Sequence, residues 1–284
     1  MTVTCKCDKS LVLSLFLNLF HMKKTFLFVI TILFLFSCSR VMITGRKQVA
    51  LVSDAELLNM SLVSYKEFID SVPLSTDVQQ TALVKKVGEN IANAVESYMK
   101  NNGLTNEIAN YAWEFNLVQD KTVNAFCMPG GKVVFFEGIM PVCENEAGIA
   151  VVMGHEVAHA VAKHSKERIS QQMLLSYGAS VTDMLLTQKS AATRQSVQLL
   201  YGLGAQYGVI LPYSRNHESE ADRLGLIFMA MAGYDPTAAV AFWERMAAGE
   251  SGSVPEFLST HPASAKRIAN IKKLLPEALG FYKK

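Results

Sequence analysis

The chain has 284 residues, of which 50% are hydrophobic and 18% are charged, and its formal net charge is +2. This length and composition suit one large globular domain or two small ones, and they exclude the disordered and fibrous classes. The 27 Lys and Arg residues nearly balance the 25 Asp and Glu residues and form no basic stripe, so nucleic acid is not an expected partner.

The amino terminus has the pattern of a targeting leader. Two lysines precede an apolar run of about a dozen residues that ends in Leu-Phe-Ser-Cys at Cys38. This ending resembles a bacterial lipobox, although Phe36 is bulkier than the usual residue. We therefore expect residues 1–37 to be removed and Cys38 to carry a lipid that anchors the protein to a membrane. The alternative is an uncleaved signal anchor. A second apolar run ahead of Met22 indicates that translation starts at Met22.

The leader predicts a lipoprotein of the bacterial cell envelope that faces the periplasm. Residues 38–75 would form a tether and a first helix, and residues 76–284 would form one domain, because no Pro-rich or Ser-rich linker divides them. Beyond the leader and Cys38, the chain contains only Cys127 and Cys143. They form either a disulfide or two buried thiols.

Two helices are expected at the start of the body. Ser53 is a suitable N-cap for a helix over residues 54–69. Asp77 can start another helix, which ends near Lys100, before Asn-Asn-Gly. The body is therefore predicted to be mostly helical.

A short β region follows. Residues 111–118 and 124–136 are rich in aromatic and β-branched side chains, and Pro129-Gly130-Gly131 separates two short runs. This pattern predicts a hairpin, and helix returns near Glu144.

Two apolar segments lie further along, at residues 173–186 and 197–211. Both are shorter than the roughly 20 residues that a bilayer requires, and both contain Gly or polar residues. We therefore expect buried core helices rather than membrane spans.

His155, Glu156 and His159 interrupt the apolar segment VVMGHEVAHAV. Histidines four residues apart project from the same face of a helix, which suits two nitrogen ligands of one tetrahedral metal ion. Glu156 is rotated from His155 by about 100°, where it can reach a water at the metal without binding the metal. This H-E-x-x-H spacing is typical of zinc metallopeptidases.

A third ligand must come from elsewhere in the chain. The positions where metzincins carry Gly and His hold Ala162 and Ser165, which excludes that class. Glu218 and Asp222 lie one helical turn apart, so one can bind the metal while the other accepts a hydrogen bond from a ligand imidazole.

Three further ionisable residues are placed outside the ligand set. We interpret Glu220 as a surface residue, because it points away from the face that Glu218 and Asp222 share. His164 belongs either to a polar face or to the residues that support a ligand, and His217 is a weaker ligand candidate.

The H-E-x-x-H motif followed by Glu218-x-x-Ala221-Asp222 resembles peptidase family M48. The stretches NAFCMPGGKVVFFEGIM (124–140), STHPASAKRI (259–268) and ITGRKQVALVSDAEL (from Ile43) are similar to further parts of that family. The resemblance implies an α+β, mainly helical, zincin-like fold of the gluzincin type with a small antiparallel β hairpin or sheet. Residues 76–284 would be the peptidase domain.

The resemblance also implies the composition of the metal site. One Zn²⁺ per chain would be bound by His155, His159 and Glu218. Glu156 would be the general base, and Asp222 would support the ligands.

Further residues are implied around this site. His261 would act either as a contact to the substrate or transition state or as a regulatory fourth ligand, and Arg267 would support its loop. A loop histidine without such a role is the alternative for His261. Asn124, Ala125 and Phe126 would pair with an extended substrate backbone, or else would belong to the core.

Together these patterns predict a zinc-dependent endopeptidase of the bacterial envelope that hydrolyses misfolded or unassembled proteins. The alternative is a latent or non-catalytic zinc lipoprotein that acts as a chaperone or assembly factor. Glu156 favours the enzyme, because a binding protein needs no general base. The sequence predicts protein or peptide substrates and a membrane partner, and it leaves the oligomeric state open.

Overall fold

The computed structural model describes residues 38–205, 211–248 and 256–283. The predicted leader lies outside the described residues, which begin at Cys38 in the first strand. The helices are α2 (Asp54–Ser71), α3 (Val78–Asn101), α4 (Thr105–Ile108), α5 (Met140–Cys143), α6 (Glu146–Val161), α7 (His164–Leu185), α8 (Ala191–Ala205), α9 (Leu211–Met231), α10 (Ala238–Ala248), α11 (Glu256–Thr260) and α12 (Ala265–Leu279). The strands are β1 (Cys38–Arg40), β2 (Lys47–Val49), β3 (Glu114–Val118), β4 (Ala125–Met128) and β5 (Lys132–Phe136).

The mainly helical fold with small sheets confirms the predicted fold class. The two predicted caps are present, since the Ser53 hydroxyl accepts a hydrogen bond from the Glu56 amide at 3.1 Å. Asp77 does the same for the Gln80 amide at 2.9 Å. Each cap satisfies one of the amides that the first turn of a helix leaves unpaired.

The predicted hairpin is the antiparallel pair β4 and β5, in which Ala125 lies opposite Phe135. Gly130 and Gly131 close it with φ values of 91° and 82°, which glycine adopts without strain. The sheet contains one strand more than a hairpin, because β3 pairs with β5 in parallel. The order β3-β5-β4 makes the sheet mixed and leaves β4 at an edge.

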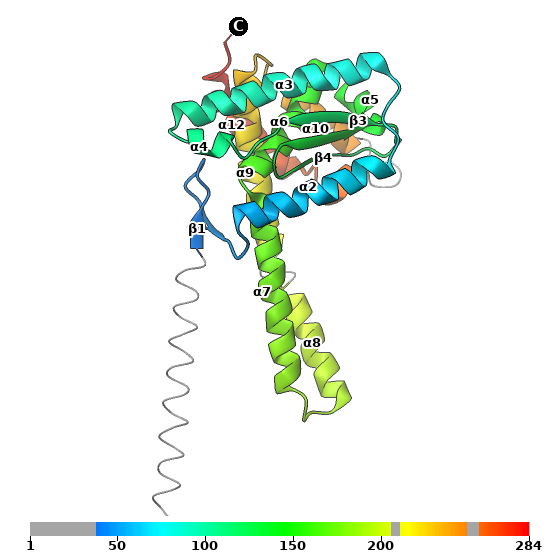
Figure 1. The fold of residues 1–284 in the computed structure, drawn as a ribbon, viewed down its shortest axis with the longest axis vertical. Coiled ribbons are helices and arrows are strands. Elements are labelled where there is room, and N and C mark those ends of the chain that lie inside the picture. The colour runs from blue at the N-terminus through cyan, green and yellow to red at the C-terminus, as the bar shows by residue number, and fades with distance from the viewer. Residues whose placement is uncertain (1–37, 206–210, 249–255, 284) are drawn as a thin grey trace, which may run out of the picture.

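The sheet is buried on both faces. Phe115, Val133 and Phe135 lie on the face that packs with α3 and α6 in the main hydrophobic core. Val134 lies on the other face, against Tyr65 of α2. Figure 1 shows this layering, with α2 and α3 running along opposite sides of the sheet.

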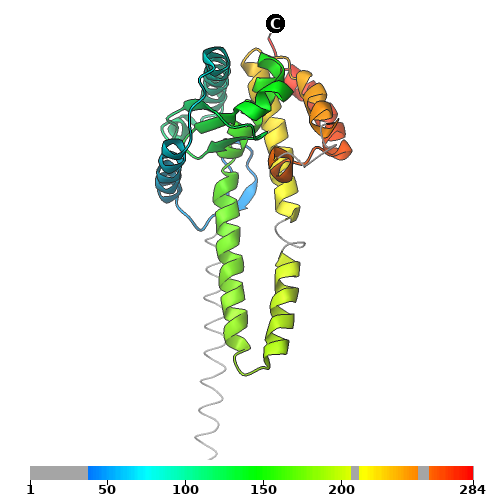
Figure 2. The same ribbon diagram turned by 90° about the vertical axis from the view of Figure 1, so that its right-hand side faces the viewer.

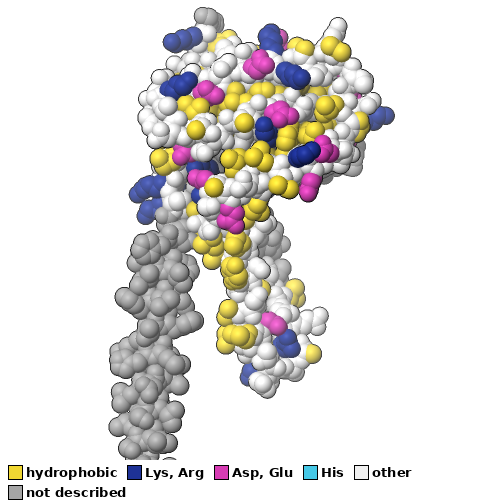
Figure 3. Space-filling model, in the orientation of Figure 1, with side chains coloured by type: hydrophobic (Ala, Val, Ile, Leu, Met, Phe, Trp, Pro, Cys, Tyr) yellow, Lys and Arg dark blue, Asp and Glu magenta, His cyan; other side chains and the backbone are white. Residues whose placement is uncertain are grey.

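The helical hairpin of α7 and α8 corrects one prediction. We expected residues 173–186 and 197–211 to form buried core helices. Residues 206–210 lie outside the described residues, and α7 and α8 project side by side away from the body (Figure 2). Large apolar side chains on this hairpin are exposed, among them Tyr177 at 61% and Leu200 at 68%. Figure 3 shows hydrophobic side chains along the projecting helices. An apolar sequence identifies a surface that avoids water but does not determine what covers it. Among the described residues, no helix has both the length and the apolarity needed to cross a bilayer.

Candidate metal centre

Three elements carry the side chains that meet in the core. α6 presents His155, Glu156 and His159, which are 2%, 4% and 8% exposed. α9 brings Glu218 against them, and His261 follows α11 directly. All of these side chains are buried, although their chemistry would otherwise favour water.

His155, His159, Glu218 and His261 form one cluster whose ligand atoms all lie within 4.8 Å of one another. The Nε2 atoms of His155 and His159 are 3.0 Å apart. Nδ1 of His261 lies 3.1 Å from Nε2 of His155 and 2.9 Å from Oε2 of Glu218. Oε1 of Glu218 lies 3.2 Å from Nε2 of His159.

These separations fit a single zinc ion. Ligand atoms at the usual zinc distances of roughly 2.0–2.1 Å occupy the corners of a tetrahedron whose edge is about 3.3 Å. Three imidazole nitrogens and one carboxylate are also a donor set that zinc prefers. The four residues therefore fit one Zn²⁺, in agreement with the predicted cofactor.

The rear nitrogen of His155 faces Asp222. Its Nδ1 lies 3.1 Å from Oδ1 of Asp222, so the imidazole donates there and directs the lone pair of Nε2 into the cluster. Arg267 binds the same carboxylate through Nε at 2.9 Å and Nη2 at 2.7 Å, and its guanidinium lies 3.6 Å from the ring centroid of Trp243. Burial alone would raise the pKa of Asp222, but Arg267 and His155 hold that pKa below its ordinary value.

A second chain of contacts reaches His159 from behind. Nδ1 of His159 lies 2.8 Å from Nδ1 of His164, and Nε2 of His164 lies 2.9 Å from Oε2 of Glu220. Glu220 also contacts Thr44, and its Oε2 accepts a hydrogen bond from Nε of Arg46 at 2.7 Å. Because Glu220 can only accept when ionised, His164 donates to it and accepts from His159. The free lone pair of His159 is then Nε2, which points into the cluster.

The expectation that Glu220 is a surface residue is therefore wrong. Glu220 does lie away from the face that Glu218 presents, but the residues between β1 and β2 cover it with Thr44 and Arg46. Burial opposes ionisation, yet His164, Thr44 and Arg46 lower the pKa of Glu220 to about 2. No pattern in the sequence links residue 46 to α9, which explains why Arg46 was not predicted.

His217 lies outside the cluster. It is 2% exposed, and its Nε2 is 2.9 Å from Oε2 of Glu167. Its ring stacks on His164 at a centroid distance of 4.2 Å. The structure thus places His217 behind the residues that support His159, and not among the four that fit a metal.

Glu156 is buried beside the cluster. Its Oε1 atom is buried without a hydrogen-bond partner among the described residues, and it lies 3.5 Å from Nε2 of His261. Burial raises the pKa of Glu156, and the neighbouring His261 and His155 oppose this shift. A carboxylate with a free oxygen and a raised pKa can accept a proton and release it again.

The predicted substrate strand lies beside this cluster, at the sheet edge. Asn124 precedes β4, and the carbonyl oxygen of Asn124 accepts from the Phe136 amide at 3.1 Å. Ala125 is buried, and the ring of Phe126 packs edge-on against Phe68 at 5.2 Å. β4 contacts α6, so an extended chain added to this edge would run past the helix that carries His155, Glu156 and His159.

The segment that carries His261 is attached to the same edge. The Phe257 amide donates to the carbonyl oxygen of Val123 at 3.1 Å, and the Phe257 ring lies 4.7 Å from the His261 ring. α11 thus holds His261 in the cluster from the side on which β4 would receive a substrate.

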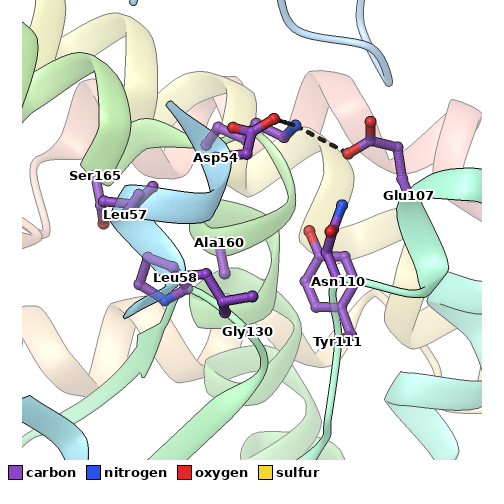
Figure 4. A pocket seen from close by; sticks show the side chains of 11 residues that line it. Asp54, Leu57, Leu58, Glu107, Asn110, Tyr111, Gly130, Ala160 and Ser165 are labelled. Carbon is purple, nitrogen blue, oxygen red and sulfur yellow. Dashed lines mark hydrogen bonds and ion pairs between the residues drawn. The ribbon is translucent and has the colours of Figure 1, made fainter. Parts of the chain in front are cut away.

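A separate pocket lies beyond the end of α6 (Figure 4). Lys163 ends this helix in the left-handed conformation, with φ of 57°, and its ammonium pairs with Asp54 and Glu107 at 2.9 Å each. Leu57 and Tyr111 also line the pocket, which contains none of the four cluster residues. Because the charges at its rim are already paired, this pocket joins α2, α4 and α6 rather than extending the metal centre.

The two cysteines of the body are free thiols. The sequence left a disulfide open, and the structure decides against it. Cys143 is fully buried.

A sequence model of peptidase family M48 matches residues 85–275, which is more than half of the chain. The chain belongs to peptidase family M48. This confirms the resemblance drawn from the two motifs. M48 metallopeptidases use zinc, as the donor set of the cluster also indicates.

Two M48 relatives are the mitochondrial metalloendopeptidases OMA1 of Schizosaccharomyces pombe and Saccharomyces cerevisiae. The first is 45% identical over 168 residues, which cover 58% of this chain and 48% of the relative. The second is 39% identical over 197 residues, which cover 66% of this chain and 54% of the relative. The Beta-barrel assembly-enhancing protease of Escherichia coli is 27% identical over 207 residues, which cover 71% and 40%. The chain spans about half the length of the two fungal relatives and less of the bacterial one.

These relatives contradict the predicted location in a bacterial envelope. The proteins with the higher identities are named as mitochondrial, and the bacterial relative has lower identity. The prediction relied on a basic segment followed by an apolar one, and this pattern indicates targeting to a membrane without specifying which membrane. Lipidation of Cys38 stays a prediction.

Proposed function

We propose that this M48 chain is a zinc-dependent endopeptidase that hydrolyses peptide bonds of misfolded or unassembled proteins. The observation that carries the proposal is the buried Glu156 carboxylate, one oxygen of which accepts no hydrogen bond, beside a donor set that fits zinc. A purely structural zinc site needs no such carboxylate, and burying a carboxylate oxygen without a hydrogen bond destabilises the fold.

The proposed roles follow from the contacts. His155, His159 and Glu218 would hold the ion, and Asp222 and His164 would orient the two imidazoles through their rear nitrogens. When bound, zinc supplies a Lewis acid that polarises a carbonyl and makes a water more acidic. Glu156 would take the proton from the attacking water and pass it to the nitrogen of the leaving amine as the peptide bond breaks.

His261 adds a regulatory element to this proposal. Its Nδ1 atom fills the fourth corner of the cluster, where an active zinc enzyme keeps a place for water or substrate. We assign the described arrangement to a latent form, in which His261 must leave before cleavage. This observation also favours the second candidate, a zinc protein that binds unfolded chains without cleaving them.

Cleavage of casein by purified full-length protein tests the proposal, together with zinc content. The matched variant is Glu156→Gln, which keeps the side-chain volume and removes the base. We expect about one zinc per chain in both proteins and cleavage only in the unsubstituted one. Equal cleavage by both proteins would contradict the role of Glu156 as the base. If both proteins bind zinc and neither cleaves casein, the non-catalytic candidate is favoured.

The proposal includes membrane attachment through the segment that precedes residue 38. It rests on the apolar run at residues 26–36. Flotation of the full chain with lipid vesicles tests the attachment, and incorporation of a lipid analogue into the unsubstituted protein but not into Cys38→Ser tests the lipid. Failure to float would remove the attachment and leave the peptidase proposal intact.

A further inference from the structure

The helical hairpin of α7 and α8 has an apolar stripe that nothing in the described part of the chain covers. On α7 it consists of Leu174, Tyr177, Val181, Met184 and Leu185, all exposed, with Leu185 at 72%. Their positions fall within an arc of roughly 100° around the helix axis. A contiguous apolar surface of this kind on a projecting element marks an interaction site.

The hairpin also lacks the charges of a helix in water. Residues 169–182 and 195–205 contain no Asp, Glu, Lys or Arg. Near the tip, Asp183 and Arg194 neutralise each other at 2.7 Å. A helix exposed to water normally carries charged residues opposite its apolar face, so this composition favours an apolar medium over a polar partner.

Several hydroxyl groups of the hairpin are hydrogen-bonded within it. Ser180 donates to the Ser176 carbonyl oxygen at 3.0 Å, and Thr182 donates to that of Gly178 at 2.8 Å. Ser196 bonds back to the Ala192 carbonyl oxygen at 2.9 Å in the same way. A polar group that is already hydrogen-bonded loses little when water is removed, whereas an unpaired group loses much. The hairpin can therefore leave water at low cost.

The hairpin tyrosine that faces the other helix is paired as well. The Tyr201 hydroxyl donates to the Leu175 carbonyl oxygen at 2.9 Å. Gly178 makes this approach possible, because a Cβ there would lie 2.2 Å from that hydroxyl. This contact ties α7 to α8, while the α7 stripe and Leu199 and Leu200 of α8 remain exposed.

The chain itself indicates which partner this is. The apolar run at residues 26–36 ends two residues before Cys38, where β1 begins. The segment around β2 is bonded to the base of α7, through Arg46 to Glu167 at 2.7 Å and through the Leu51 amide to Ser170 at 2.9 Å. β1 and the hairpin lie on the same side of the body (Figures 1 and 2). β1, which directly follows the predicted leader, and the apolar stripe therefore lie on the same side of the body.

We propose that the outer face of the α7–α8 hairpin docks into the acyl-chain region of a lipid bilayer. It would act as a second membrane contact beside the segment that precedes residue 38. The inference rests on the membrane attachment proposed above but not on the peptidase activity. The two contacts would hold the metal centre at a fixed height over the membrane, so that protein segments near the bilayer surface are presented to β4.

Tryptophan quenching in vesicles tests the docking with the full-length protein. Tyr177→Trp places the probe on the stripe, and Val78→Trp places a control at a position that is 79% exposed at the start of α3, along the edge of the body opposite the hairpin (Figure 1). Emission from Trp113 and Trp243 is removed by subtracting the signal of the unsubstituted protein. Lipids with brominated acyl chains should remove about half of the emission from residue 177 and leave that from residue 78 unchanged.

Four other outcomes would overturn the docking. Quenching of residue 177 by aqueous acrylamide and not by brominated lipid would place the stripe in water. Protection from both quenchers would indicate a protein partner, including a second copy of this chain. If the protein floats with vesicles but brominated lipid does not quench residue 177, the attachment before residue 38 stands and the docking of the hairpin is rejected. If the protein does not float, both the attachment and the docking are rejected.

Discussion

Gly154 of α6 and Gly225 of α9 face each other where the two helices pack. A Cβ on Gly154 would lie 2.7 Å from the Gly225 carbonyl oxygen, and one on Gly225 would lie 2.9 Å from the Gly154 carbonyl carbon. Only glycine allows two backbones to approach so closely. Gly154 directly precedes His155, and Gly225 lies one turn after Asp222, so this contact sets the distance between the helices that carry the ligands.

Gly225→Ala should therefore weaken both the fold and the metal site. The new methyl group must push α9 away from α6, which destabilises a packed core by about 1–3 kcal/mol. Zinc affinity should fall with it, because Glu218 moves with α9. Urea unfolding of the zinc-free protein and competition with a chelator measure the two effects.

Gly202→Ala is the matched control, since a Cβ at Gly202 of α8 meets nothing within 4 Å. It should stabilise the protein by up to about 1 kcal/mol through helix propensity and leave zinc affinity unchanged. If Gly225→Ala behaves like this control, the close approach of the helices does not set the ligand geometry.

The contact between Arg46 and Glu220 gives a second prediction. Glu220 fixes the tautomer of His164, and His164 in turn directs Nε2 of His159 to the metal. Glu220→Gln should lower zinc affinity by about 10–100-fold, the usual effect of residues that support metal ligands. Arg46→Met should act in the same direction, because it leaves the carboxylate buried without its cation.

The control for this prediction is Arg223→Met on the same helix. Arg223 pairs with Glu277 in the same kind of contact, but both side chains are about 40% exposed (40% and 39%), so the loss should be small. Chelator competition on the three variants separates the cases. Equal zinc affinities for Glu220→Gln and Arg223→Met would show that the contacts behind His159 have no influence on the metal.

The parts of this site that the sequence predicts are those set by local helix geometry. His155 and His159 share a helix face because they lie four residues apart. Glu218 and Asp222 share a face of α9 for the same reason. The position of Glu220 was misjudged because the residue that covers it, Arg46, lies 174 positions earlier in the chain. The pairing of β3 with β5 was not predicted, because the two strands are parallel and no tight turn in the sequence connects them. The exposed hairpin was misjudged for the same kind of reason, since periodicity describes a face and not its environment.

His261→Ala decides between the two roles that the sequence left open. The structure places Nδ1 of His261 at the fourth corner of the cluster, so its removal should leave three ligands and open a position for water. Casein cleavage per bound zinc should rise severalfold. Thr260→Ala, next to it and outside the cluster, should change neither zinc content nor cleavage. A loss of cleavage with zinc retained would instead make His261 a contact to the transition state.

Cys143 predicts how stability changes in alkaline solution. Burial raises the pKa of its thiol to about 12 from the ordinary value of 9.0, and Arg245 opposes this only in part. The folded protein keeps the thiol protonated between these values, whereas the unfolded chain loses the proton above pH 9. The free energy of unfolding should therefore decrease as the pH rises, with this thiol contributing up to about 1.4 kcal/mol per pH unit.

Cys143→Ala isolates that contribution. The substitution lowers the free energy of unfolding at every pH by removing a buried side chain, so the informative quantity is the slope with pH and not the value itself. In urea unfolding between pH 8 and 10.5, the free energy of unfolding should fall less steeply with pH for Cys143→Ala than for the unsubstituted protein. At the upper end of this range the difference between the two slopes should approach the value for release of one proton. At pH 8 the two slopes should nearly agree, because the thiol is almost fully protonated in both the folded and the unfolded state. Parallel slopes over the whole range would mean that the folded protein ionises Cys143 as readily as the unfolded chain, which would contradict its burial in the core.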